Sequence, residues 1–270
     1  MEKLWQEMRQ WMAKYAKSFY TDDEEVQLGI SLKEEHTGYV MRHCLDLARH
    51  LKLSEHDVYL AGIIGLFHDV GRFRQYTIYK TFNDARSEDH ADLGLKVLTE
   101  EMPLMEKLTA TDEATVRFAI QNHNKMLIGE TADKKQLLMA KIIRDADKLD
   151  IYRVLAPYLR ADMAEKAPKF IHTSASQEVS PDFAADFMAG KQADYHNIRT
   201  HGDRKIVRLM WVYDLNFAWT LEKVMEQGYV KMVMDSLPKT PEIEEGIKRM
   251  ENYIAEKRKR LNGEADTINL

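Results

Sequence analysis

The chain has 270 residues, of which 31% are charged and 44% hydrophobic, and its net charge is −5. This length allows one large core, and the nearly balanced charge argues against a dedicated nucleic-acid-binding surface. The single cysteine, Cys44, excludes an internal disulfide and fits a reducing compartment. No apolar run reaches the ~20 residues of a membrane span, and the first residues do not resemble a signal peptide, so we expect a cytoplasmic protein without membrane contact.

Apolar residues recur with a period near 3.6 along almost the whole chain, and no strand pattern stands out. We therefore predict an all-α fold. Helices are expected from the N-terminus to an acidic turn at 22–24, from near His36 to Leu51, from Ser54 to Gly71, from Ser87, from Asp112 to His123, and from Thr131 to Leu155. Gly71 is expected to end its helix, and residues 72–86 to form an irregular connection rich in aromatic residues.

Beyond residue 156 we expect further helices over 182–192, 207–227 and 241–260, with Gly228 as a stop or kink. No segment has the composition of a linker, so the chain is predicted to be a single all-α domain over residues 1–270. The aromatic helix expected at 207–227 belongs to the core or to a subunit interface, which leaves a homodimer open.

Six residues that can bind metal ions lie on, or at the edge of, the apolar stripes of these helices. They are His36, His68, Asp69, His90, His123 and Asp147. An unpaired carboxylate on a buried face is costly, so two of them among four imidazoles make sense if all converge on cations. Imidazole and carboxylate suit Fe, Mn, Ni, Co or Zn, with Mg as a further candidate, and the lack of cysteine ligands argues against a structural thiolate zinc site.

The number of ions stays open between one and two. The two oxygens of Asp69 allow it to bridge two ions while His68 binds one. Two divalent ions would leave the site positively charged, which attracts a phosphoryl group and supplies a deprotonated nucleophile near neutral pH. In a one-metal site, His90 and His123 would instead contact the substrate or the other ligands.

This pattern resembles the HD-domain superfamily of metal-dependent phosphohydrolases over about residues 30–155, which leaves 156–270 as a C-terminal helical extension. His36 in Glu-Glu-His-Thr-Gly resembles the first histidine of the family, and His68-Asp69 before Val-Gly-Arg resembles its eponymous pair. Asp147 in Ala-Asp-Lys-Leu resembles the final aspartate, and Asp145 is the rival. The two further ligands, His90 and His123, resemble the extra histidines of the branches that bind two metals.

The resemblance implies an HD-domain helical bundle that hydrolyses a small phosphate ester, for example a nucleotide, by attack of metal-bound hydroxide. Asp69 and Arg72 would be its catalytic residues, and no separate general acid is evident. The chain lacks the Gly-Tyr-Pro signature of the cyclic-dinucleotide phosphodiesterases, which argues against their substrates. A di-iron oxygenase of the same superfamily and a non-catalytic nucleotide-sensing module are the alternatives.

Several other polar residues have two interpretations each. Cations that could bind a phosphate, or be ordinary solvated charges, are Arg72, Lys80, Arg86, Lys125 and Arg144. Aromatic residues in 73–82 could stack on a nucleobase or pack against the helices. Of the remaining histidines, His43 and His50 are expected to be structural, and His56, His172, His196 and His201 to lie at the surface or in loops.

Overall fold

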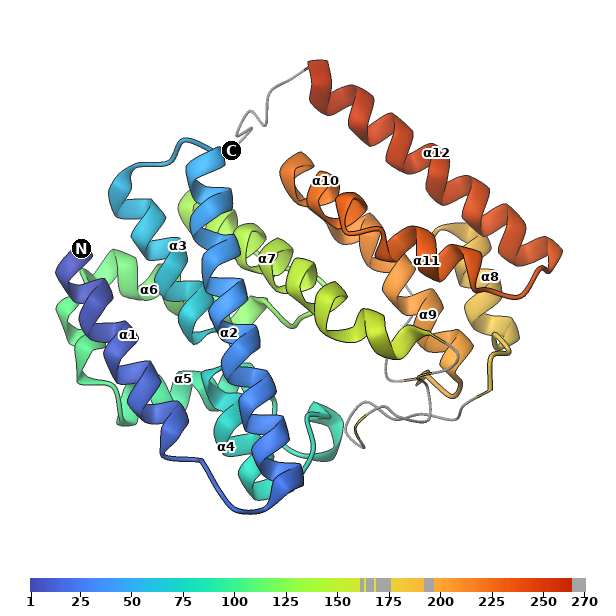
Figure 1. Ribbon diagram of the computed structural model, residues 1–270. Helices are drawn as coiled ribbons and strands as arrows, with labels where there is room; N and C mark the ends of the chain where they lie inside the picture. The colour runs from blue at the N-terminus through green and yellow to red at the C-terminus, as the bar shows by residue number, and fades with distance from the viewer. Residues whose placement is uncertain (161–162, 164–167, 169–175, 192–196, 264–270) are drawn as a thin grey trace. The chain divides into compact units, whose positions relative to one another are not determined.

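The computed structural model describes residues 1–160, 163, 168, 176–191 and 197–263. Helices and their connections account for this part of the chain, which contains no β-strand, so the predicted all-α fold is confirmed (Figure 1). The chain divides into two compact units, the first comprising Met1–Asp150 and the second lying within Ile151–Thr267. The single domain expected from the sequence stays a prediction. No helix in the described ranges is long and apolar enough to cross a bilayer.

The first unit is built from seven α-helices, the last of which continues beyond it. They are α1 (Glu2–Lys17), α2 (Glu24–His50), α3 (Glu55–Phe67), α4 (Val70–Tyr79), α5 (His90–Glu100), α6 (Ala110–Asn122) and α7 (Lys134–Leu159), with short 3₁₀ turns at Asp84–Arg86 and Pro103–Lys107. The most extensive packing joins α2 to α3, followed by α4 to α5. Almost every residue of α3 from Val58 to Phe67 is buried, so this helix forms the centre of the unit.

A glycine allows α2 and α3 to approach closely next to the predicted metal site. A Cβ at Gly65 would lie 2.9 Å from the Cα of Met41 and 2.9 Å from the sulfur of Cys44. The buried position of Cys44 is the one expected for a structural cysteine. This close packing places the end of α3, and therefore His68, directly against α2.

The prediction that Gly71 ends a helix was wrong. The helix α3 ends at Phe67, the chain turns at His68 and Asp69, and α4 begins at Val70. Gly71 lies in the first turn of α4, where a Cβ would meet the carbonyl oxygen of His90 at 2.3 Å. This glycine therefore permits close packing of α4 on α5, and most of the expected irregular connection is helical.

Several expected helix starts were also wrong, by two or three residues for α5, α6 and α7 and by about twelve for α2, which begins at Glu24 and not near His36. The side chains that accept hydrogen bonds from first-turn N–H groups are those of Asp23 for α2, Asp89 for α5, Thr109 for α6 and Asp133 for α7. The starts of α5, α6 and α7 were misplaced because several capping residues lie close together in the sequence. Ser54 caps α3 as predicted.

The second unit contains four short helices and one long helix, α12, in the described part of the chain. They are α8 (Pro181–Ala189), α9 (His201–Met210), a 3₁₀ turn (Trp211–Asp214), α10 (Ala218–Glu226), α11 (Tyr229–Asp235) and α12 (Pro241–Gly263). The prediction of a single helix over 207–227 was wrong, because the 3₁₀ turn and the extended residue Leu215 interrupt the helical segment. Gly228 has a φ of 72° and redirects the chain between α10 and α11, as its predicted role as a stop requires.

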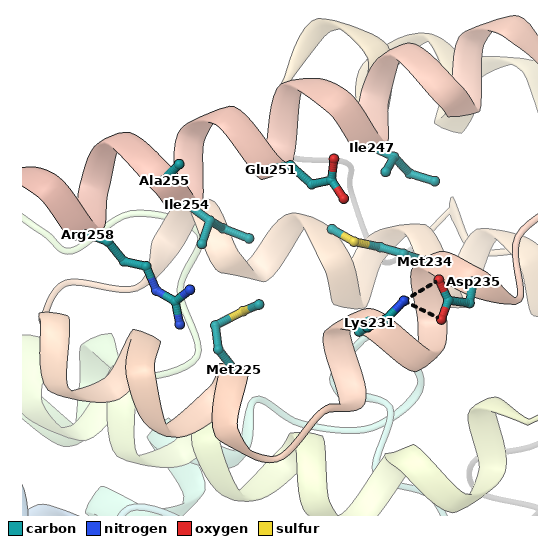
Figure 2. Close-up of a pocket in the computed structure, with 9 residues that line it drawn as sticks. All are labelled: Met225, Lys231, Met234, Asp235, Ile247, Glu251, Ile254, Ala255 and Arg258. Carbon is teal, nitrogen blue, oxygen red and sulfur yellow. Dashed lines mark hydrogen bonds and ion pairs between the residues drawn. The ribbon is translucent and has the colours of Figure 1, made fainter.

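A pocket of about 570 Å³ lies between α10, α11 and α12 (Figure 2). Its lining is mainly apolar, and Lys231 at its edge pairs with Asp235 at 2.8 Å. It contains no histidine and none of the six predicted metal ligands. His201, expected at the surface, is instead buried in α9 with its Nε2 3.1 Å from the carbonyl oxygen of Leu159, whereas His172 and His196 lie outside the described residues.

Candidate metal centre

The six predicted ligands come together in the first unit, four from helix ends and two from inside helices. His36 comes from α2 and Asp147 from α7, whereas His68 follows α3, Asp69 precedes α4, His90 begins α5 and His123 follows α6. Five of the six are buried, and the side chain of Asp147 is 16% exposed. The site therefore lies inside the helical bundle, with Asp147 on the side that solvent reaches.

The donor atoms form two groups. In the first, Oδ1 of Asp147 lies 3.0 Å from Nε2 of His36 and 3.6 Å from Nε2 of His68, and these two nitrogens are 3.4 Å apart. In the second, the Nε2 atoms of His90 and His123 are 2.9 Å apart. His36, His68 and Asp147 form a set that could hold a metal ion. His90 and His123 form another such set together with Asp69.

Asp69 lies between the two groups. Its Oδ2 is 3.5 Å from Nε2 of both His36 and His68. Its Oδ1 is 3.3 Å from Nε2 of His90 and 3.8 Å from Nε2 of His123. Each oxygen of this carboxylate thus faces a different pair of histidines, which is the arrangement expected for a carboxylate shared by two ions.

All four histidines are oriented by an acceptor at Nδ1. The acceptors are Oδ2 of Asp150 for His36 at 2.6 Å, the carbonyl of Gly65 for His68 at 2.9 Å, Oδ2 of Asp84 for His90 at 2.7 Å, and the carbonyl of Ile120 for His123 at 2.6 Å. We assign the tautomers from these neighbours: Nδ1–H donates, and the lone pair of a neutral ring is left on Nε2. Metal-binding histidines are commonly held in this way.

This donor set fits a metal ion. Two unprotonated Nε2 atoms cannot hydrogen-bond to each other, yet His90 and His123 bring theirs to 2.9 Å. A cation between them satisfies both lone pairs. The site offers only nitrogen and carboxylate oxygen, which suits first-row transition metals and argues against a thiolate zinc site.

The orienting aspartates were not identified from the sequence. Asp150 lies three residues after Asp147 on α7, so its place on the same helical face was a usable signal. Asp84 lies in a 3₁₀ turn, where no periodicity marks it. Between the two candidates for the final aspartate, Asp147 belongs to a ligand group and Asp145, although buried, does not.

Burial and neighbouring charges together set the pKa values of the predicted ligands. Burial alone would raise the pKa of Asp69, but Lys33 and the surrounding histidines hold that pKa well below its usual range. Burial lowers the pKa of His68, and burial together with the charge of Arg72 lowers the pKa of His90 to about 4. These two rings are thus neutral near pH 7, as metal binding requires.

His36 differs from the other histidines. Burial and the charge of Lys33 lower its pKa, but hydrogen bonds to Asp147 and Asp150 outweigh them and raise the pKa overall. Carboxylates on both ring nitrogens favour the imidazolium form. Metal binding at Nε2 must therefore displace a proton from this ring.

Of the five cations considered as phosphate ligands, Arg72 lies nearest to the ligand groups. Its Nε is 3.5 Å from Oδ1 of Asp69, and its Nη1 donates to Gln75, Asp84 and the carbonyl of Phe82. Its Nε is buried and has no hydrogen-bond partner among the described residues.

The other four cations face elsewhere. Lys80 and Arg86 have exposed side chains, and Lys125 pairs with Asp89 at 2.6 Å. Arg144 is buried, and its guanidinium donates to the carbonyls of Asn122, Lys125 and Met126, so it fastens the loop that follows His123.

The aromatic residues at 73–82 are used largely for packing. Phe73 and Tyr76 are buried, and the ring of Tyr76 stacks on that of Phe82 with centroids 4.3 Å apart.

Residues 34–152 match the family model of the HD domain, and this range contains all six ligands. This segment of the chain is therefore similar to an HD domain, a domain that suggests metal-dependent hydrolase activity. No curated protein and no solved structure matches the chain.

Proposed function

We propose that this chain is a metal-dependent phosphohydrolase that acts on small phosphate esters, with nucleotides as one candidate class. The observation that carries the proposal is the position of Asp69, whose two oxygens face two separate histidine pairs. One ion would be held by His36, His68, Asp69 and Asp147, and a second by Asp69, His90 and His123. Bound ions would polarise the phosphoryl group and lower the pKa of water at the site.

Arg72 is proposed to bind the phosphoryl group. Three acceptors hold its Nη1 in place, so the guanidinium loses little freedom when a substrate binds. Its Nε lacks an acceptor although it is buried, and a phosphoryl oxygen beside Asp69 would supply one. Its charge would also offset the negative charge that develops on the transferred group.

The substrate is proposed to enter beside Asp147. The side chains of Arg72 and Asp147 are 13% and 16% exposed, whereas that of His68 is fully buried. His68 after α3 and His123 after α6 are both buried, which supports entry on the side of Arg72 and Asp147.

The test is metal analysis of protein purified without chelator, followed by a screen of phosphomonoesters, phosphodiesters and nucleotides with each metal. His68→Ala and Asp69→Ala should lose metal and activity together. His50→Ala, an exposed histidine of α2, is the matched control and should keep both. Hydrolysis at the parent rate by a metal-free His68→Ala protein would exclude the proposal, and bound iron with substrate-dependent oxygen consumption would indicate an oxygenase instead.

A further inference from the structure

A lysine that the sequence analysis passed over contacts the carboxylate at the centre of the site. Lys33 lies on α2, one turn before His36, and its Nζ is 2.7 Å from Oδ2 of Asp69. This is the same oxygen that faces Nε2 of His36 and of His68, each at 3.5 Å. A cation held by these two histidines and Asp69 must therefore share this oxygen with the ammonium of Lys33.

Lys33 and Arg72 contact opposite oxygens of Asp69 and differ in how firmly they are held. Arg72 is fixed by three acceptors of its Nη1. Lys33 has Asp69 as its one hydrogen-bond acceptor in the described part of the chain, and its ammonium also lies over the ring of Phe82. Lys33 can thus leave Asp69 without breaking any other hydrogen bond.

The ring of Phe82 also faces the lysine ammonium while it is bonded to Asp69. Nζ of Lys33 lies 5.2 Å from the centroid of this ring, and Cζ of Arg72 lies 5.8 Å from the same centroid. Stacking on Tyr76 at an interplanar angle of 18° holds the ring in place. An ammonium that stays over Phe82 is therefore near the guanidinium of Arg72, and two adjacent cations favour an oxyanion between them.

We propose that Lys33 is a substrate-binding residue that exchanges partners: a metal ion takes Oδ2 of Asp69, and the released ammonium binds an anionic oxygen of the substrate together with Arg72. This inference rests on the proposed function for its second half only. The side chain of Lys33 is 15% exposed, so its ammonium can reach a ligand that enters beside Arg72. No bond is made or broken, and Lys33 remains charged throughout.

The exchange has a consequence that a purely supporting lysine would not have. Removing Lys33 removes a competitor for Asp69 and a positive charge that repels the ion, so metal binding should become tighter. Removing it also deletes one charge-assisted hydrogen bond to the bound anion, so phosphate binding should become weaker. Opposite effects on the two ligands distinguish exchange from general damage to the site.

The experiment measures the Kd of Mn²⁺ by calorimetry, and then the Kd of inorganic phosphate for the Mn²⁺-loaded full-length protein. For Lys33→Met we expect Mn²⁺ binding about fivefold tighter and phosphate binding about tenfold weaker. Lys33→Arg keeps the charge and should bind phosphate within about threefold of the parent. Lys135→Met is the matched control, since Lys135 pairs with Asp57 at 2.7 Å and Asp112 at 3.1 Å in the same unit, and it should change neither Kd.

Unchanged or weaker Mn²⁺ binding by folded Lys33→Met protein would overturn the competition for Asp69. Tighter Mn²⁺ binding with parent-like phosphate binding would overturn the transfer of the ammonium to the anion. Neither measurement requires turnover. Failure of the parent to hydrolyse any phosphate ester would therefore refute the proposed function separately, without changing either binding result.

Discussion

The Nε2 atoms of His90 and His123 lie 2.9 Å apart, while Nδ1 of each ring is already bonded to Asp84 or to the carbonyl of Ile120. Two neutral rings held in this way present two lone pairs to one point in space. The pair is therefore a poor hydrogen bond and a suitable pair of metal ligands. This relationship supports the proposal of a second ion at these two histidines.

We accordingly predict that His123→Gln lowers the metal content from two ions per chain to one. The remaining ion should be held by His36, His68, Asp147 and Oδ2 of Asp69, whereas His123 faces the other oxygen of Asp69, Oδ1. Elemental analysis after removal of free metal gives the stoichiometry. A parent protein that holds a single ion, and keeps it in His123→Gln, would contradict the two-ion site.

Asp150 is predicted to tune the affinity of the first ion without touching it. Its Oδ2 lies 2.6 Å from Nδ1 of His36 and is fully buried. Asp150→Asn should weaken metal binding by about 10- to 100-fold, the usual cost of removing such an orienting carboxylate. Titration with Mn²⁺ measures the change. Asp46→Asn, which alters an exposed aspartate of α2, is the control and should bind as the parent does.

The raised pKa of His36 predicts a pH-dependent metal affinity. Below this pKa the ring is protonated and the ion must displace a proton, so affinity falls as the pH drops through it. Above it the ring is neutral, and this dependence disappears. Calorimetry in buffers of different ionisation enthalpy measures the proton release directly. Asp150→Asn, which lacks one of the carboxylates that raise the pKa, should release less of a proton, and release unchanged in that variant would refute the assignment.

Gly71→Ala is predicted to destabilise the protein. Its Cβ would lie 2.3 Å from the carbonyl oxygen of His90 and 2.6 Å from the amide nitrogen of Gly94, both backbone atoms that cannot rotate away. The helices α4 and α5 would have to separate, at a cost of about 1–3 kcal/mol. Denaturant unfolding of the metal-free protein measures this.

Gly38→Ala is the matched control for that substitution. Its Cβ would meet only the guanidinium of Arg42, at 3.9 Å, and it lies within the same helical unit. Replacing a glycine by alanine in an open helical position should stabilise by up to about 1 kcal/mol. Equal effects of the two substitutions would show that close packing of α4 on α5 is not what Gly71 provides.

The helical class of the protein was readable in the sequence, and so was the inward placement of the six residues predicted as ligands. Helical periodicity depends on neighbours three and four residues apart, so the apolar stripes that carry His36, His123 and Asp147 are local features. The immediate context of Asp147 likewise separated it from Asp145. Helix boundaries near Gly71 and at 207–227 were not readable, since a glycine that ends a helix and one that lets two helices touch look the same in a single sequence.

The functional details that tertiary structure alone decided join distant parts of the chain. The contact between Lys33 and Asp69 spans 36 residues, and that between His36 and Asp150 spans 114. Periodicity can place each residue on the inward side of its own helix, but it carries no information on which residue of another helix lies opposite. Helix packing, through close approaches such as those at Gly65 and Gly71, sets those pairings. The sequence therefore determined which residues can bind metal, and the packing determined that Asp69 stands between two pairs of histidines with Lys33 on one of its oxygens.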